Sequence, residues 1–198
     1  MHLPNLILKL HEINALKFGT FNSNGIDSPF RIDLRLVVSF PEILQTIGEL
    51  VWKKIQPLNF DLLCGVPYTA MVIATGISLA HNKPMVMRRK EIKDQGTKKI
   101  IEGSFTTGQT CLVIEDLITS GNSILETIEP LEKEGLTIRD AAVLIDREQG
   151  GQMRLAKQGY NLHAVFTVSE MMHLLENRGR VEKGTTTKVL EFLKHQYA

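Results

Sequence analysis

The stretch CLVIEDLITSGNSILET, residues 111–127, decides the fold predicted for this chain. Four apolar residues lead into two adjacent carboxylates, Glu115 and Asp116. Small hydroxylated residues around a glycine follow from Thr119 to Ser123, and an apolar helical pattern comes next. The stretch therefore predicts a buried strand that turns directly into a helix, with polar groups at the turn.

The rest of the chain alternates between the same two kinds of element. Helices are predicted at residues 4–16, 39–55, 68–81, 120–135 and 183–196, and Ser39 is expected to cap the second of them as part of a capping box with Glu42. The strands lack apolar–polar alternation and are separated by helices, which indicates an α/β fold with a central, mostly parallel sheet flanked by helices. The predicted strands are residues 60–67, 84–89, 110–116, 141–146 and 162–168.

The predicted sheet also predicts where a ligand binds. In an open parallel sheet, ligands bind beyond the carboxyl ends of the strands. The chemistry is therefore expected in four segments, residues 65–69, 88–99, 115–123 and 146–151.

Composition excludes several classes of function. The 198 residues suit one domain, and a formal charge of +1 gives no electrostatic case for nucleic acid or an anionic membrane. No apolar run is long enough to span a bilayer, and the N-terminus lacks the pattern of a signal peptide. Cys64 and Cys111 lie in apolar runs, which favours buried, reduced thiols and a cytoplasmic protein.

The turn from Thr119 to Ser123 has the composition of an anion site, because backbone N–H groups and the helix dipole converge there. Glu115 and Asp116 would repel a phosphate alone, but they would accept hydrogen bonds from the hydroxyls of a sugar phosphate. The alternative is structural, with Asp116 or Thr119 as a helix cap and Glu115 as a solvated acid.

This array resembles the phosphoribosyl-pyrophosphate (PRPP) motif of type I phosphoribosyltransferases. The stretches DLLCGVPYTA, RRKEIKDQGTKK and LIDREQGG further resemble the orotate phosphoribosyltransferase family, in the same order, within residues 18–169. The resemblance implies the type I phosphoribosyltransferase fold, with a small N-terminal hood mainly from residues 1–35, in a single domain over 1–198.

The resemblance also implies roles for individual residues. Glu115 and Asp116 would hold the ribose hydroxyls, and Asp116 and Lys93 would be catalytic. The segment 88–99, with six basic and two acidic residues, would be the catalytic loop rather than a solvated surface loop. The full set implied to bind PRPP is Tyr68, Thr69, Arg89, Lys90, Lys93, Gln95, Glu115, Asp116, Thr119, Ser120, Gly121, Asn122 and Ser123.

The orotate site is implied to comprise Arg31, Ile32, Thr119 and Arg147. Arg147 would bind the substrate carboxylate with its planar fork, whereas an isolated arginine here would be a surface ion-pair partner. The stretch Asn22–Gly25 has no lysine where the family usually has one, and Arg31 replaces the usual aromatic residue.

The expected reaction joins orotate to the ribose 5-phosphate of PRPP, giving orotidine 5′-monophosphate and pyrophosphate for pyrimidine synthesis. The implied cofactor is Mg²⁺, held mainly by the oxygens of PRPP, with no protein ligand to the metal. The implied partner is a second copy of the chain, in a homodimer with shared active sites. Two alternatives remain: a type I transferase acting on another base, and a non-catalytic PRPP-binding regulator.

Overall fold

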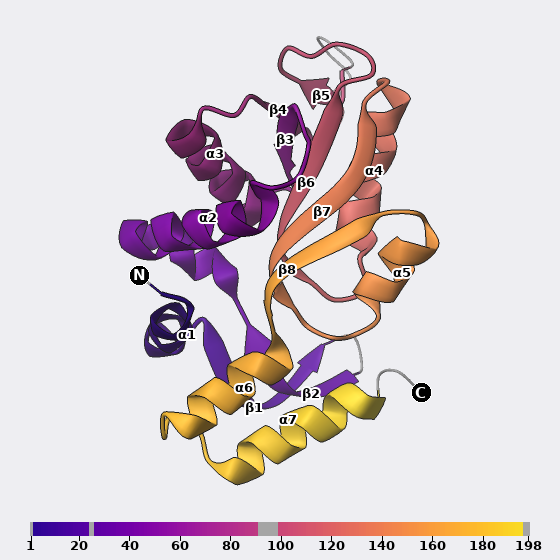
Figure 1. Cartoon of the computed structure of the whole chain (residues 1–198). Helices are drawn as coiled ribbons and strands as arrows, with labels where there is room; N and C mark the ends of the chain where they lie inside the picture. The colour runs from indigo at the N-terminus through magenta and orange to yellow at the C-terminus, as the bar shows by residue number, and fades with distance from the viewer. Residues whose placement is uncertain (1, 24–25, 91–98, 196–198) are drawn as a thin grey trace.

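The computed structural model describes residues 2–23, 26–90 and 99–195. Its central sheet has six strands in the order β5-β4-β3-β6-β7-β8, all parallel except the pairing of β4 with β5. The predicted mostly parallel sheet is confirmed (Figure 1). Its strands are β3 Leu62–Gly65, β4 Met85–Arg88, β5 Ile101–Glu102, β6 Thr110–Ile118, β7 Thr137–Asp146 and β8 Asn161–Thr167.

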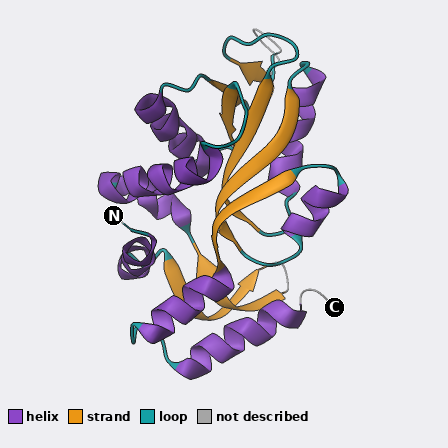
Figure 2. Cartoon of the chain, in the orientation of Figure 1, coloured by secondary structure: helices purple, strands orange, loops and turns teal. Residues whose placement is uncertain are grey.

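Helices cover both faces of this sheet (Figure 2). Helices α2 (Pro41–Ile55) and α3 (Thr69–His81) contact one face, and α4 (Asn122–Lys133) and α5 (Gly151–Lys157) contact the other. Burial from both sides explains why the strands are continuously apolar. Strand β6, for example, is buried from Cys111 to Glu115 without alternation.

A separate two-stranded hairpin lies beside the main sheet (Figure 1). Strands β1 (Leu16–Ser23) and β2 (Ile26–Ile32) pair antiparallel, and the 3₁₀ helix η1 (Leu34–Ser39) follows them. Helix α1 (Leu3–Glu12) contacts β1 and α6, and α7 contacts β2, so this layer draws on both ends of the described chain. The last two helices are α6 Val168–Asn177 and α7 Lys183–His195.

Two local predictions were wrong. The first helix ends at Glu12 rather than residue 16, because Asn14 takes a left-handed conformation with φ 60°. Ser39 does not cap α2: it belongs to η1, and Phe40 occupies the cap position without a side-chain hydrogen bond. Pro41 begins the helix, where its missing N–H costs nothing.

Candidate active site

Three strands end side by side at the edge that was predicted to bind a ligand. Gly65 pairs with Ile114, and Asp146 pairs with Ile118. The chain continues this pairing past the strands, since the Val66 N–H donates to the Ile114 carbonyl at 2.9 Å and the Arg147 N–H to the Ile118 carbonyl at 3.0 Å. The segments that follow β3, β6 and β7 therefore meet, as expected from the sequence.

A cavity of about 870 Å³ lies between this edge and the hairpin. Seven of the predicted site residues line it: Arg31, Ile32, Tyr68, Thr69, Glu115, Asp116 and Arg147. The hairpin and the start of η1 add lining residues that were not among the predicted site residues, namely Thr20, Phe21, Asn22, Ser28, Phe30, Asp33, Leu34 and Arg35.

The two acids lie inside strand β6 rather than beyond its end. Glu115 is only 7% exposed, and burial, followed by the charge of Asp116, raises its pKa to about 8. Burial likewise raises the pKa of Asp116 above its ordinary value. Glu115 Oε1 accepts the Asp116 N–H at 3.0 Å, and Asp116 Oδ1 accepts the Leu117 N–H at 2.8 Å. The two carboxyl groups are therefore held in fixed positions, and a ligand that donates hydrogen bonds to them would stabilise them.

The turn after the acids lines a second cavity, of about 420 Å³. Gly121 has φ +81° and stands immediately before helix α4, a conformation that disfavours other residues. The start of this helix carries free N–H groups and the positive end of the dipole. The predicted residues that share this cavity are Glu115, Asp116, Thr119, Ser120, Gly121, Asn122 and Ser123. Glu115 and Asp116 line both cavities, so the residues predicted to hold the sugar hydroxyls and the phosphate are contiguous.

Arg147 directly follows β7 and lines the larger cavity. Burial lowers its pKa from the ordinary value, and its Nε is buried with no hydrogen-bond partner among the described residues. The guanidinium lies 4.9 Å from the centre of the Phe30 ring. Arg147 is half-buried, and leaving its buried Nε without a partner is costly, so this position is suited to binding an anionic group of a ligand. The alternative of a surface ion-pair partner does not fit this geometry.

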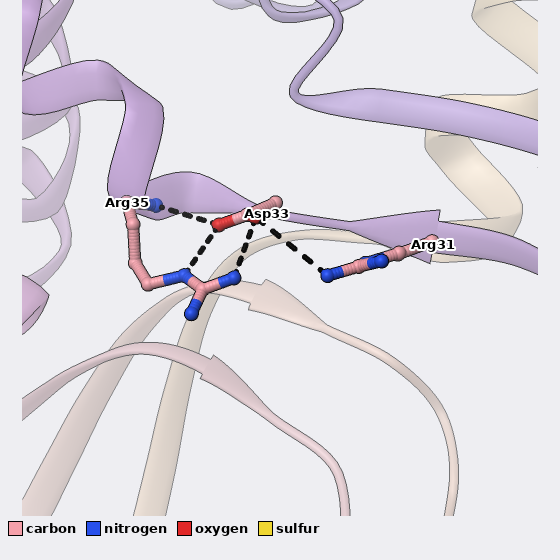
Figure 3. A network of polar contacts seen from close by, with 3 residues as sticks. All are labelled: Arg31, Asp33 and Arg35. Atoms are coloured by element: carbon pink, nitrogen blue, oxygen red, sulfur yellow. Dashed lines mark hydrogen bonds and ion pairs between the residues drawn. The ribbon is translucent and has the colours of Figure 1, made fainter. Parts of the chain in front are cut away.

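The hairpin side of the cavity carries a small charged network (Figure 3). Arg35 binds Asp33 through Nε at 2.7 Å and Nη2 at 2.6 Å, and Arg31 Nη2 lies 4.0 Å from Asp33 Oδ2. The hydrogen bond to Asp33 is the main reason that the pKa of Arg35 is raised, and the charge of Asp116 adds to it. Asp33 is therefore closely paired with Arg35, and the longer contact of Arg31 leaves its guanidinium available to an anionic group of a ligand.

The remaining predicted residues fall into three groups. Tyr68 is 70% exposed, and the Lys90 ammonium lies 5.4 Å from the centre of its ring. Arg89 lines neither cavity and pairs with Glu102 at 3.2 Å. Lys93 and Gln95 lie outside the described residues.

Within residues 2–23, 26–90 and 99–195, no group of three or more His, Cys, Asp or Glu side chains could hold a metal ion. None of the helices in the described part of the chain is long and apolar enough to cross a membrane.

Comparison with known proteins defines the class. Residues 37–173 match the family described as "Phosphoribosyl transferase domain". The structure resembles that of Leishmania donovani UMP synthase with a TM-score of 0.89, at 31% identity, over 97% of this chain and 42% of that one. The matched domain and the shared fold place this chain in the class of phosphoribosyltransferases.

Sequence relatives narrow the class. The chain is 49% identical to the orotate phosphoribosyltransferase of Chlamydia caviae over 85% of this chain and 84% of that protein. It is 45% identical to the uridine 5′-monophosphate synthase of Bos taurus over 97% of this chain, but it spans only 41% of that longer protein. The chain belongs to the orotate phosphoribosyltransferase family.

Proposed function

We propose that this protein transfers ribose 5-phosphate from PRPP to orotate, giving orotidine 5′-monophosphate and pyrophosphate in pyrimidine biosynthesis. The observation that carries the proposal is the contiguity of the two acids, the phosphate turn and the unpaired Arg147 at one edge of the sheet. Each of these features matches one chemical group of the two substrates.

The ribose phosphate fits the acids and the turn. Glu115 and Asp116 accept hydrogen bonds from the 2′ and 3′ hydroxyls, while residues 119–123 donate to the 5-phosphate. This placement directs the sugar carbon C1′ into the larger cavity, which the acids also line. Tyr68 and Thr69, at the start of α3, line the same cavity and are proposed to contact the pyrophosphate.

Orotate fits the part of the larger cavity near Arg147. The guanidinium fork matches the planar carboxylate of the base, and Arg31, Ile32 and Thr119 are proposed to complete its surroundings. In the reaction, a ring nitrogen of orotate bonds to C1′ as the bond from C1′ to the pyrophosphate oxygen breaks, and the proton of that nitrogen is released. Positive charge develops on the sugar, as at the sugar ring in glycosidases.

The leaving pyrophosphate requires compensation of its negative charge. We assign this role to Arg89, Lys90 and Lys93, with Lys93 donating a proton to the leaving group and Asp116 supporting the charge on the sugar. Closure of the basic segment 88–99 over the substrates would exclude water.

Mg²⁺ is proposed to bind mainly through PRPP oxygens. The pair Glu115–Asp116 supplies only two acids, and both have raised pKa values, which fits hydroxyl donors better than a metal held by protein ligands alone. The ion would supply neutralisation of phosphate charge.

The proposed assembly is a homodimer. Exposed apolar side chains lie on η1 (Leu36 and Val38), α3 (Val72) and β4 (Met87), and α3 contacts both of the other elements. Exposed apolar side chains on adjoining elements are suited to an interface. A cytoplasmic location is proposed because Cys64 and Cys111 are free and buried.

The test is a base panel. Release of pyrophosphate from PRPP, in the presence of Mg²⁺, would be measured with orotate, uracil, adenine and hypoxanthine in separate assays. We expect orotate alone to support rapid release, because only orotate carries the carboxylate that Arg147 fits. Release with another base would identify a different transferase, and release with none of the four would favour a non-catalytic PRPP-binding protein.

A further inference from the structure

Helix α5 packs directly against the phosphate turn. A Cβ atom on Gly151 would lie 2.5 Å from Ile118 Cγ1 and 2.6 Å from the Thr119 carbonyl oxygen, so only glycine permits this approach. A Cβ atom on Gly121 would meet the Gly151 carbonyl oxygen at 3.6 Å. The first turn of α5 is thus in contact with the backbone that holds the proposed phosphate site.

One side chain of α5 reaches the turn itself. Arg154 Nη1 lies 3.5 Å from the Ser120 carbonyl oxygen and donates a short hydrogen bond to Asn122 Oδ1. Both acceptors belong to the segment that is proposed to bind the 5-phosphate. Arg154 therefore links helix α5 to this segment through hydrogen bonds.

The contact fixes the orientation of the Asn122 amide. A guanidinium has donors only, so the atom of Asn122 that faces it must be the oxygen. The amide Nδ2 then remains available as a donor, since no hydrogen bond from it is found among the described residues. Arg154 at the same time binds a backbone carbonyl, which holds the peptide groups of the turn in one arrangement.

Arg154 also adds positive charge near the site. Glu126, Glu129 and Glu132 of α4 line the groove that Arg154 shares, but no described carboxylate lies within 4.0 Å of its guanidinium. Arg154 therefore forms no ion pair with a carboxylate in the described part of the chain.

We infer that Arg154 is a positioning residue for the ribose 5-phosphate: it holds the turn and the Asn122 amide in the arrangement that binds this phosphate. The inference rests on the proposed function and extends it, since it separates the 5-phosphate from the pyrophosphate of the same substrate. Arg154 touches the turn, so its loss should weaken binding of the 5-phosphate alone.

The test compares two ligands and three variants. Arg154→Met keeps the aliphatic stem and removes the donors and the charge, Arg154→Lys keeps the charge, and Lys157→Met removes a cation from the same helix without touching the turn. Dissociation constants for ribose 5-phosphate and for pyrophosphate would be measured by calorimetry. KM for PRPP and kcat for orotate turnover would be measured with the same preparations.

We expect Arg154→Met to raise the dissociation constant of ribose 5-phosphate and the KM for PRPP by about tenfold, the size typical of a lost charge-assisted contact. Pyrophosphate affinity and kcat should change by less than about twofold, because Arg154 contacts neither the proposed pyrophosphate site nor the reacting groups. Arg154→Lys should recover part of the loss, and Lys157→Met should match the wild type.

Unchanged ribose 5-phosphate affinity in Arg154→Met would overturn the inference, and so would an equal loss of pyrophosphate affinity. If Arg154→Met does not fold, as judged by thermal unfolding, Arg154→Lys carries the test, and wild-type ribose 5-phosphate affinity in that variant then overturns the inference. A wild type that fails to turn over orotate would instead overturn the proposed function, and with it this inference.

Discussion

Glu115 and Asp116 are adjacent carboxyl groups that the fold buries together in strand β6. Burying two such groups is unfavourable when both are charged, so burial raises the pKa of each carboxyl group. The site therefore favours a bound proton that either group would release in water. A ribose that donates hydrogen bonds to them offsets this cost. The residues that bind substrate in our proposal therefore lower the stability of the folded protein when no ligand is bound.

The first prediction is a pH dependence of stability that is due to Glu115. Its ordinary pKa is 4.5 and its pKa in the folded protein is about 8. Between these values the folded protein holds a proton that the unfolded chain has released, so the free energy of unfolding falls as pH rises through this window. The slope for one full proton is about 1.4 kcal/mol per pH unit.

Glu115→Gln has no proton to lose, so we expect its urea unfolding to show a shallower fall between pH 5 and pH 8 than the wild type, with greater relative stability at the upper end. Glu129→Gln, on the exposed face of α4, is the control and should keep the wild-type slope. Parallel pH profiles for Glu115→Gln and the wild type would show that Glu115 is not the titrating group.

The second prediction concerns Arg147. Arg147→Lys keeps the charge but loses the planar fork, so we expect the KM for orotate to rise by about tenfold or more while the KM for PRPP changes little. Arg139→Lys, an exposed position earlier on the same strand, is the matched control. Steady-state kinetics with each substrate varied would check both. Wild-type kinetics in Arg147→Lys would remove Arg147 from the orotate site.

At the scale of elements, the turn from β3 into α3 depends on Gly65. A Cβ atom there would lie 2.5 Å from the Ala70 carbonyl oxygen and 2.5 Å from Met71 Cα, both in the backbone of the first helical turn. This close approach brings Tyr68 and Thr69 to the edge of the sheet, beside Glu115.

The third prediction follows from that contact. Gly65→Ala should lower the free energy of unfolding by about 1–3 kcal/mol or more, because the helix must move away from the strand. Gly184→Ala is the control, since a Cβ atom there meets nothing within 4 Å. Urea unfolding would measure both. Equal stability of Gly65→Ala and the wild type would mean that the turn adapts without strain.

The main elements were predictable because their signals are local. The five predicted strands are apolar runs such as residues 60–67, and the central strands β3, β6 and β7 are the ones that are mostly buried. The hairpin and η1 were not predicted as elements. The hairpin packs on α7, which is distant in sequence, and η1 packs on α3 as well as on the neighbouring α2. Ser39 carried a genuine capping pattern, but η1 extended through it and moved the start of the helix to Pro41.

The candidate site was predictable where residues lie in the last part of a strand or directly after it. Glu115 and Asp116 lie in the last part of β6, Arg147 directly follows β7, and the parallel sheet brings these parts of the two strands together. Asp33 and Arg35 reach the same cavity from the start of η1, so no strand-end rule could find them. Arg154 lies in a segment for which no helix was predicted, and only the structure places it in α5 against the turn.

The fourth prediction belongs to the whole molecule and tests shared active sites. Lys93→Ala and Asp116→Ala would be purified separately, and each should be nearly inactive. After subunit exchange, one site of a mixed dimer carries both defects and the other carries none, if the segment 88–99 serves the partner's site. Random exchange makes half the dimers mixed, so about a quarter of the wild-type activity should return.

If that segment serves the site of its own chain, every site keeps one defect and no activity returns. Native mass spectrometry of the mixture would establish that exchange took place. Persistent inactivity in a mixture with mixed dimers would rule out the shared site, and a monomeric wild type would rule out the dimer.

The central claim is that this edge of the sheet joins orotate to the ribose of PRPP. It is tested most directly by incubating the folded wild-type protein with orotate, PRPP and Mg²⁺, and following orotate absorbance together with the products. We predict that orotate disappears only when PRPP is present, with orotidine 5′-monophosphate and pyrophosphate formed in equal amounts. No loss of orotate at saturating PRPP, from protein with a cooperative unfolding transition, would contradict the account.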